Sequence, residues 1–263
     1  MKYPTQLHKK RVIILATEGQ TTNLLYNNLV KHYNVETVII EEKISSKLIL
    51  KNRIKNLGLF KTFGQLVFVV FVPRILRIFS KKRIQQIIEN YSQNDKPIPS
   101  NKITPITSIN DKLTIQIVQD SSPELIFVNG TRIINKKIIE TINIPMLNIH
   151  VGITPKYRGV HGGYWALYNN DLKNFGTTIH YIDSGIDTGR IITQETTNIT
   201  QYDNFTTYPL IQYCLGLKTL SNELLKSNQN NNKLKNSKTP DSKLHYHPTI
   251  TQYLYKRIFK GIK

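Results

Sequence analysis

The stretch RVIILATEGQTTNLLYNNLVKHYNVETVII, residues 11–40, decides the fold class. Val12 to Ala16 is an apolar, mostly β-branched run, which is typical of a buried strand. The polar turn TEGQTTN follows, and the leucines after it recur at helical spacing. A second apolar run then occupies residues 35–40. The order strand, turn, helix, strand predicts the start of a doubly wound α/β sheet.

Further apolar runs continue this pattern along the chain. We predict buried strands at Leu113–Val118, Leu125–Val128 and Met146–His150, and a short helix at Lys136–Thr141. Helix-length segments between short apolar strands favour a Rossmann-like, mostly parallel sheet. Ligands of such sheets bind at the carboxyl ends of the strands. The residues just after Ala16, Val128 and Leu147 are therefore the first candidates for chemistry.

The composition sets limits on the class of protein. A chain of 263 residues with 39% hydrophobic residues can form a sizeable core, and its single cysteine, Cys214, excludes an internal disulfide framework. The first apolar run is only five residues long, too short for a signal peptide, so we expect a cytoplasmic protein. The net charge of +19 is compatible with nucleic acid, an anionic membrane or a phosphorylated substrate, and equally with a lysine-rich compositional bias.

Residues 43–89 carry basic residues on both sides of an apolar middle. Leu66 to Val72 is apolar for seven residues and Pro73 then interrupts it, short of the ~20 residues that span a bilayer. We predict a helical insertion that packs on the sheet. The alternative is a basic amphipathic surface that rests on anionic lipid or a lipid-linked substrate, which would make the protein membrane-associated.

The C-terminal part predicts a helix over Tyr208–Leu225, a solvated loop SNQNNNKLKNSKTPDSK, and an aromatic and basic end that packs on the main domain. The domain prediction is a catalytic domain over residues 1–203, with the insertion at about 43–89, and a helical extension over residues 204–263. His245 and His247 lack an acidic or cysteine companion nearby, so we do not expect them to bind metal.

Most of the chemistry lies in residues 147–192, LNIHVGITPKYRGVHGGYWALYNNDLKNFGTTIHYIDSGIDTGRII. Asn148 and His150 are two apart at a strand end, so their side chains project to the same face. An amide donor beside an imidazole suits a developing oxyanion. The predicted strand at 176–182 contains His180, and the loop DSGIDTG adds two carboxylates. This set predicts an acid–base site without a side-chain nucleophile.

The ordered motifs N-x-H, P-K-Y-R-G, G-T-x-x-H and D-x-G-x-D-x-G strongly resemble the folate-dependent formyltransferases. That family includes glycinamide ribonucleotide transformylase, methionyl-tRNA formyltransferase and the amino-sugar N-formyltransferases. The resemblance implies catalytic roles for Asn148, His150 and Asp187, with Asp187 rather than Asp183 as the catalytic aspartate. It also implies 10-formyltetrahydrofolate as the formyl donor and no metal.

By the same resemblance, Asn148 and a protonated His150 stabilise the oxyanion, while Asp187 keeps that histidine charged and helps a water to move a proton. The residues expected to bind folate are Asn129, Gly130, Thr131, Arg132, Ile134, Asp183 and Gly185. Those expected to bind the acceptor are Gly19, Thr22, Asn23, Tyr157, Arg158 and His161.

The acceptor amine is less clear from the sequence. The loop at 19–23 resembles the phosphate-binding loop of glycinamide ribonucleotide transformylase, although a helix-capping turn would look alike. We predict an amino sugar that is phosphorylated, nucleotide-linked or lipid-linked. The alternative is the phosphoribosylglycinamide formyltransferase of purine biosynthesis, against which the longer chain, the 43–89 segment and the loop Gly152-Ile153-Thr154-Pro155 argue.

Two further alternatives rank below these. Methionyl-tRNA formyltransferase would account for the charge, but the C-terminal part has no counterpart of that enzyme's β-barrel domain. A non-catalytic basic binding protein is disfavoured by the intact trio, and nucleic acid is not expected as a partner. The sequence leaves open whether the chain forms a homodimer.

Overall fold

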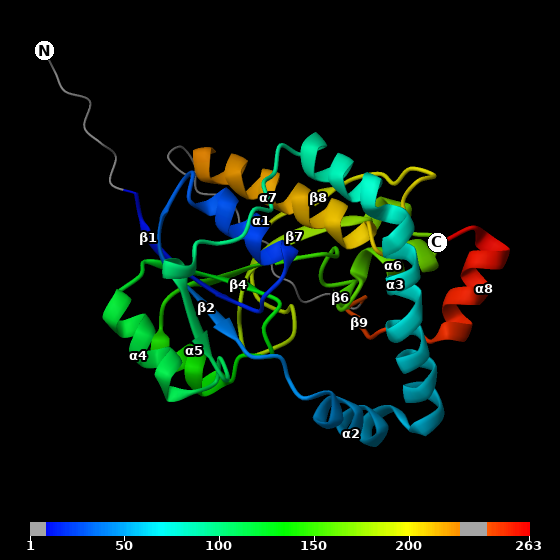
Figure 1. Ribbon diagram of the computed structural model, residues 1–263, viewed down its shortest axis with the longest axis horizontal. Helices are drawn as coiled ribbons and strands as arrows, with labels where there is room; N and C mark the ends of the chain where they lie inside the picture. The colour runs from blue at the N-terminus through cyan, green and yellow to red at the C-terminus, as the bar shows by residue number, and fades with distance from the viewer. Residues whose placement is uncertain (1–8, 227–240) are drawn as a thin grey trace, which may run out of the picture. The chain divides into compact units, whose positions relative to one another are not determined.

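The computed structural model describes residues 9–226 and 241–263 (Figure 1). Its strands are β1 (Arg11–Ala16), β2 (Asn34–Glu41), β3 (Ile103–Ile106), β4 (Leu125–Asn129), β5 (Met146–His150), β6 (Arg158–Gly159), β7 (Gly176–Tyr181), β8 (Ile191–Thr196) and β9 (Leu244–His245). Its α-helices are α1 (Gln20–Leu29), α2 (Ser46–Leu57), α3 (Leu59–Asn90), α4 (Lys112–Ser121), α5 (Lys136–Ile142), α6 (Gly162–Tyr168), α7 (Tyr208–Lys226) and α8 (Ile250–Lys260). Two 3₁₀ turns, η1 (Ser100–Lys102) and η2 (Leu172–Asn174), complete the set.

Seven strands form one mostly parallel sheet in the order β3-β2-β1-β4-β5-β7-β8, which confirms the predicted fold class. The chain divides into two compact units. The first comprises Met1–Glu42 and Asn94–Asn148, and the second Lys43–Gln93 and Ile149–Lys263. The predicted boundary at residue 203 is not tested by this division and stays a prediction.

The first unit is built on β1, whose residues from Val12 to Ala16 are fully buried. β1 pairs in parallel with β2 and β4, and β4 pairs in parallel with β5. In this register Ala16 lies opposite Asn129, and Val128 lies opposite Asn148. The carboxyl ends of β1, β4 and β5 therefore meet at one edge of the sheet, the position where parallel sheets bind ligands.

The prediction of a strand at Leu113–Val118 is wrong, because this segment belongs to helix α4. The carboxylate of Asp111 caps the helix by accepting a hydrogen bond from the backbone N–H of Leu113 at 3.0 Å. Thr114 and Val118, four residues apart, are its buried positions. The sequence LTIQIV alternates like a strand, but the acidic cap and the one-sided burial make it a helix.

The sequence analysis missed β6, β8, β9 and also β3, which has the sequence ITPI. It lies at the edge of the sheet and pairs with β2 alone. Pro105 has no N–H to donate, so it is tolerated only at such an edge. The proline and the short length hide this strand from pattern analysis.

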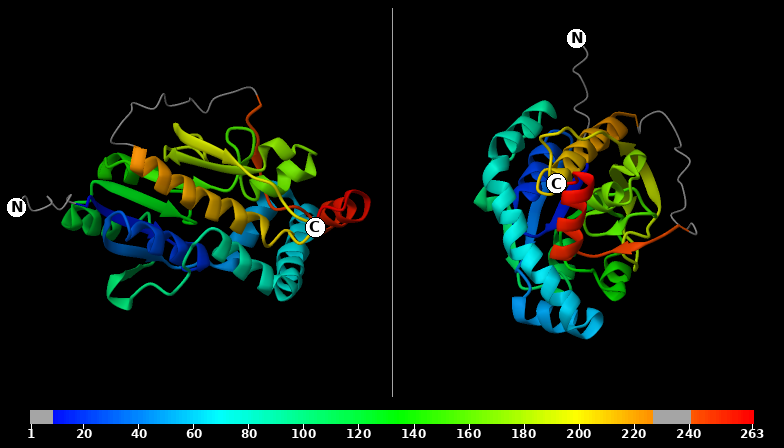
Figure 2. Two further views of the ribbon diagram at one scale, coloured as in Figure 1. Left: turned by 90° about the horizontal axis from the view of Figure 1, so that it is seen from above. Right: turned by 90° about the vertical axis from the view of Figure 1, so that its right-hand side faces the viewer.

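The second unit has the antiparallel pair β7 and β8 beneath helix α7 (Figure 2). Small residues allow the close approach of α7. A Cβ on Gly216 would lie 2.4 Å from Cγ2 of Ile149, and one on Gly163 would overlap the side chain of Gln212. The predicted helix at Tyr208–Leu225 and the predicted strand at 176–182 are confirmed.

Helices α2, α3 and α8 also belong to the second unit, and the predicted helical character of the insertion is confirmed. Pro73, which ends the apolar run Leu66–Val72, lies inside the 32-residue α3. Phe68 of α3 packs against Phe205 and Tyr253, with ring centroids 4.8 and 5.3 Å away. Tyr253 belongs to α8, whose first turn has a complete capping box from Thr249 and Gln252.

Within the described residues, α3 is a helix long and apolar enough to cross a membrane by length and composition. Only 22% of its most apolar part is buried. The predicted solvated loop lies mainly at residues 227–240, outside the described residues. The other predicted strands and helices, at 12–16, 35–40, 125–128, 136–141 and 146–150, and the helix after the turn TEGQTTN, are confirmed.

Candidate active site

The polar centre of the second unit is a contact between His150 and Asp187. His150 closes β5, and its Nδ1 lies 3.4 Å from Oδ2 of Asp187. Its Nε2 lies 2.8 Å from the backbone carbonyl of Tyr157, so Nε2 donates to that oxygen. Both ring nitrogens thus face oxygen acceptors, a geometry that suits the doubly protonated ring. The His150 side chain is 5% exposed and that of Asp187 is 14% exposed. Both groups are therefore largely shielded from bulk solvent, which screens their interaction only weakly.

The loop after β7 holds Asp187 in place. Asp187 has φ 51°, in the left-handed region that aspartate tolerates better than most residues. Its Oδ2 accepts the backbone N–H of Gly159 at 2.8 Å, and Arg158 Nη1 donates to the neighbouring carbonyl of Ile186 at 2.9 Å. A Cβ on Gly189 would overlap the carbonyl of Tyr181, so the loop closes only with glycine there.

His180 lies on the other side of the same carboxylate. Its Nε2 is 3.7 Å from Oδ1 of Asp187, and its ring centroid is 6.3 Å from that of His150. Burial and the neighbouring His150 hold the pKa of His180 below its ordinary value. His180 therefore prefers the neutral form beside Asp187, and the carboxylate charge is left to balance His150.

Asn148 precedes His150 by two residues in β5, so the pleat of the strand directs both side chains to the same face. Asp183 has a different environment from Asp187. Its Oδ1 accepts hydrogen bonds from the N–H of Gly185 at 3.0 Å and from Thr188 Oγ1 at 2.7 Å. Asp183 therefore fixes the shape of the loop, while Asp187 is the carboxylate beside the histidines.

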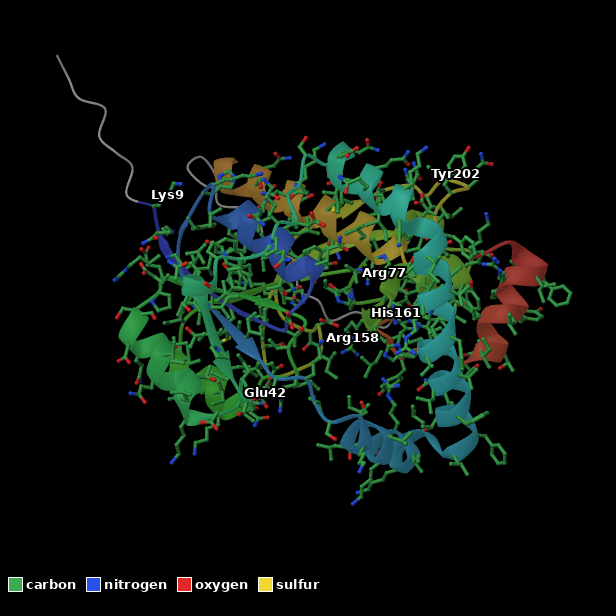
Figure 3. All side chains as sticks on the ribbon, viewed as in Figure 1. Lys9, Glu42, Arg77, Arg158, His161 and Tyr202 are labelled. Atoms are coloured by element: carbon green, nitrogen blue, oxygen red, sulfur yellow. The ribbon has the colours of Figure 1, made fainter. Side chains whose placement is uncertain are left out.

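Tyr157, Arg158 and His161 were predicted to face the acceptor, and the structure gives each of them internal partners (Figure 3 labels Arg158 and His161). Tyr157 is 1% exposed, and its hydroxyl donates to Asp171 at 2.9 Å. Burial and this bond raise the pKa of Tyr157 to about 12. Besides its bond to Ile186, Arg158 donates from Nε to Ser242 Oγ at 2.8 Å.

His161 forms a second histidine pair. Its Nε2 lies 2.9 Å from Nδ1 of His247, and its ring packs 4.5 Å from the ring centroid of Phe205. Burial, then the charge of His247, lowers the pKa of His161 to about 3. Burial, then the charge of Arg53, lowers the pKa of His247 to about 4. This pair is neutral at physiological pH.

In the first unit, the predicted folate-binding residues follow β4. Asn129 is buried and its Nδ2 donates to the hydroxyls of Thr21 and Thr22, at 3.1 and 2.9 Å. Gly130 has φ +68° and is exposed, and Thr131 is half-exposed. The backbone of this loop is therefore open to a ligand, whereas the side chain of Asn129 is used to join β4 to the start of α1.

Arg132 is fixed by Glu41, a residue that the sequence analysis missed. Glu41 is 3% exposed at the end of β2, and its carboxylate receives the backbone N–H and Nε of Arg132, both at 2.6 Å. It also accepts the N–H of Ile109 at 3.1 Å. The signal was present as the acidic pair that closes the second apolar run. Ile134, the last residue of this set, is 5% exposed and belongs to the core.

The loop at 19–23 begins α1 without a side-chain cap from Gly19. Thr22 is 1% exposed and donates to the carbonyl of Thr17 at 2.6 Å. Asn23 donates to the carbonyl of Asp95 at 3.3 Å. The backbone N–H groups of Thr22 and Asn23 donate to the carbonyl of Gly19, at 3.1 and 3.2 Å. What remains for an anion at this point is the first two N–H groups of the helix, rather than the two side chains.

Among the residues that the structure describes, no group of three histidine, cysteine or acidic side chains is arranged to hold a metal ion. His247 is paired with His161, and His245 is 6% exposed and stacks on Tyr157, with ring centroids 5.4 Å apart. These two histidines thus serve in packing.

Comparison with known proteins gives a consistent class. Residues 45–209 match the family model described as "Formyl transferase". Two curated relatives are methionyl-tRNA formyltransferases, from Syntrophus aciditrophicus (35% identical over 98 residues, 37% of this chain and 31% of the relative) and Methylacidiphilum infernorum (40% over 86 residues, 32% and 27%). The matched part of the chain thus spans about a third of the length of these relatives.

Solved structures share the fold at low sequence identity. A 4-N formyltransferase from Francisella tularensis aligns with a TM-score of 0.55 and 16% identity, over 90% of this chain and 76% of that one. A phosphoribosylglycinamide formyltransferase from Streptococcus pneumoniae aligns with a TM-score of 0.51 and 17% identity, over 84% and 99%. At such identities the likeness concerns the fold alone.

Proposed function

Because the chain belongs to the formyl transferase family, we propose that it is an N-formyltransferase that moves a formyl group from 10-formyltetrahydrofolate to an amine. The observation that carries this proposal is the buried contact between His150 and Asp187, 3.4 Å apart, in the strand that also carries Asn148. Formyl transfer needs a donor for a developing negative oxygen and a group that moves a proton, and these three residues supply both.

The folate supplies an activated formyl group to this site. When the acceptor nitrogen bonds to the formyl carbon, negative charge develops on the formyl oxygen. The amide N–H of Asn148 and the imidazolium of His150 stabilise that charge. Asp187 holds the positive charge on His150 and, through a water, takes the proton that the attacking amine loses and delivers it to the departing nitrogen. The His150–Asp187 distance of 3.4 Å is longer than a tight hydrogen bond, as is common before substrate binds.

For the donor we propose two binding segments, each taken by itself. In the first unit, the exposed backbone at Gly130 and Thr131 offers N–H and C=O groups to a flat heterocycle. Arg132, held by Glu41, fixes the shape of that loop. In the second unit, exposed Asp183 and Gly185 present a turn whose geometry is set by their own hydrogen bonds.

For the acceptor we propose an amino sugar that is phosphorylated, nucleotide-linked or lipid-linked. The uncapped first turn of α1 supports an anionic group, because its N–H groups and the helix dipole favour negative charge. The basic insertion at 43–89 gives a second reason to expect a negatively charged acceptor. The engaged side chains of Thr22, Tyr157 and His161 are proposed to position the backbone around the acceptor rather than to bind it.

The proposal is tested by incubating the protein with 10-formyltetrahydrofolate and, separately, nucleotide-linked amino sugars, glycinamide ribonucleotide and methionyl-tRNA. Release of tetrahydrofolate with a formylated amino sugar is the expected result. Turnover of glycinamide ribonucleotide alone would establish the purine-pathway alternative and reject the sugar. Turnover of methionyl-tRNA alone would reject the amino-sugar acceptor and favour the activity for which the curated relatives are named.

A further inference from the structure

The outward face of α3 is a continuous apolar stripe. Six of its side chains recur every three or four residues and so lie on one side of the helix. They are Phe60, Phe63, Val67, Phe71, Ile75 and Ile78. Phe60 is 93% exposed, Phe63 65% and Ile78 64%. The stripe covers 18 helical steps, or roughly 27 Å at about 1.5 Å per residue.

The opposite face of α3, which packs on the rest of the second unit, contains several polar contacts. Gln65 donates to the carbonyl of His247 at 2.6 Å, and Ser80 accepts from Asn204 at 2.8 Å. Arg83 forms a two-pronged ion pair with Asp203, at 2.8 and 3.0 Å. Phe68 and Val72 are also buried on that face, so α3 is apolar on both sides. A surface helix normally has one apolar face, which packs on the core, so the second apolar face indicates a further apolar covering.

Helices α2 and α8, which both contact α3, also expose apolar side chains. α2 has twelve residues and no buried one, and a helix of that length is marginal in water without a surface to pack on. On α8, carbon-rich side chains project away from the protein (Figure 3). Ile258 and Phe259 are 70% and 67% exposed there. We call α2, α3 and α8 together the apolar–basic face.

The charge of this face is almost entirely positive. Residues 43–90 contain eleven lysines and arginines and one glutamate, Glu89, and residues 250–263 contain four lysines and arginines and no acidic residue. Arg74, Arg77 and Lys81 are exposed beside the apolar stripe (Figure 3 labels Arg77). Long basic side chains can lie along apolar surface and place their charge at a phosphate layer. Apolar and basic groups on one surface match the two layers of an anionic membrane interface.

We propose that the apolar–basic face docks on the surface of an anionic lipid bilayer, with the α3 stripe in the headgroup–acyl boundary and the basic residues at lipid phosphates. A membrane-spanning α3 would have to give up the ion pair from Arg83 to Asp203 and the Gln65 bond. A second copy of the chain would bring the thirteen lysines and arginines of each face together. An RNA partner would pair with the charges but leave Phe60 and Phe63 uncovered. The proposal concerns location and does not depend on the acceptor.

The test is co-sedimentation of the full chain with vesicles of phosphatidylcholine alone and with about one-third phosphatidylglycerol. Each binding assay is run at about 0.1 M salt and at about 1 M salt, between which the screening length falls from about 10 Å to about 3 Å. We expect the protein to bind the anionic vesicles. Its affinity for the neutral vesicles should be at least about tenfold weaker, and salt should reduce its affinity for the anionic ones. Phe60→Ser/Phe63→Ser/Ile78→Ser should lower the partition at least about tenfold. Its control, Ile103→Ser/Leu113→Ser/Leu172→Ser, changes exposed apolar residues elsewhere and should not.

A charge variant separates the two contributions. Arg74→Gln/Arg77→Gln/Lys81→Gln should abolish the preference for anionic over neutral vesicles, whereas Lys112→Gln/Lys137→Gln/Lys173→Gln removes equal charge elsewhere and should keep it. Circular dichroism confirms that each variant folds. Equal binding to both vesicle types, unaltered binding by either face variant, or no binding overturns the proposal. Resistance to alkaline carbonate extraction also overturns it, because it identifies a spanning helix. A protein that does not bind lipid but forms a dimer, which only the Phe60→Ser/Phe63→Ser/Ile78→Ser variant dissociates, overturns it as well.

Discussion

Two histidine pairs lie in the second unit, and their partners differ. His150 and His180 flank Asp187, at 3.4 and 3.7 Å from its carboxylate oxygens. His161 and His247 contact each other at 2.9 Å, and the ring of Phe205 packs on His161. We refer to them as the Asp187 pair and the Phe205 pair. His150 and His180 are buried and His161 and His247 are half-buried, so neither pair is open to solvent.

The difference is set by what each ring nitrogen faces. In the Phe205 pair, a nitrogen-to-nitrogen bond requires one ring nitrogen without a proton, so at least one ring is neutral. In the Asp187 pair, both nitrogens of His150 face oxygen acceptors, and a carboxylate balances the charge. The same side chain therefore serves packing in one place and charge stabilisation in the other. The carboxylate, together with the loop that holds it, makes the difference.

The largest expected effect comes from removing that carboxylate charge. Asp187→Asn keeps the size of the side chain but removes the charge that balances His150, so kcat should fall by about 10²–10⁴-fold. Folate affinity should change only a few-fold, because Asp187 is proposed to act on the proton rather than on the pterin. Steady-state kinetics and fluorescence binding of a folate analogue measure the two effects. Transfer at the wild-type rate would refute the assigned mechanism.

Asp183→Asn is the matched control for this variant. It lies four residues earlier in the same loop, and its carboxylate bonds to Gly185 and Thr188 rather than to a histidine. An asparagine oxygen can accept the same bonds, so kcat should stay within about tenfold of the wild type. If the two variants lost activity equally, the catalytic role assigned to the Asp187 carboxylate would be wrong.

Gly159 lies beside the Asp187 pair and gives the next largest effect. Its N–H donates to Asp187, it has φ +88°, and a Cβ there would lie 2.3 Å from the carbonyl of His245. Gly159→Ala should lower the free energy of unfolding by about 2–3 kcal/mol and also reduce kcat. Gly261→Ala is the control, since φ is +66° and nothing lies within 4 Å. It should cost about 1 kcal/mol, measured by urea unfolding, and leave kcat unchanged.

Much of the fold could be predicted because local signals agreed with burial. The run at Val12–Ala16 is fully buried in the centre of the sheet, and the strand ending at His150 has the predicted bounds. The failures have local physical causes. A cap from Asp111 turned an alternating segment into a helix, and Pro105 marked an edge strand that pattern analysis does not detect.

The candidate site was partly readable from the sequence for a different reason. Asn148 and His150 are two apart in one strand, so their common face follows from the strand period. The partners of Tyr157 and His161 could not be read, since Asp171 and His247 are 14 and 86 residues away in the chain. Long-range contacts of this kind depend on the tertiary fold, which no local pattern specifies.

Acid should weaken the fold through the Phe205 pair. The pKa of His161 is about 3 and that of His247 about 4 in the folded state, below the ordinary value of 6.5. The unfolded chain therefore binds more protons below pH 6.5, so the stability from this pair is complete above pH 6.5 and is lost as pH falls toward 4. Between pH 7.5 and 5 the loss should be about 2 kcal/mol for each of the two histidines, or about 4 kcal/mol for the pair. Urea unfolding at the two pH values measures it, and an unchanged midpoint would contradict the neutral assignment.

His247→Gln gives the smallest effect and the sharpest separation of the two pairs. Glutamine removes the titrating group while it can still bond to His161, so at pH 7.5 the variant should lose about 1 kcal/mol of stability. At pH 5 the wild type has lost the stability of its neutral histidine, and the difference should shrink or reverse. Because the Phe205 pair serves packing, kcat should stay within about threefold of the wild type. A loss of more than about tenfold would instead support the predicted role of His161 in acceptor binding.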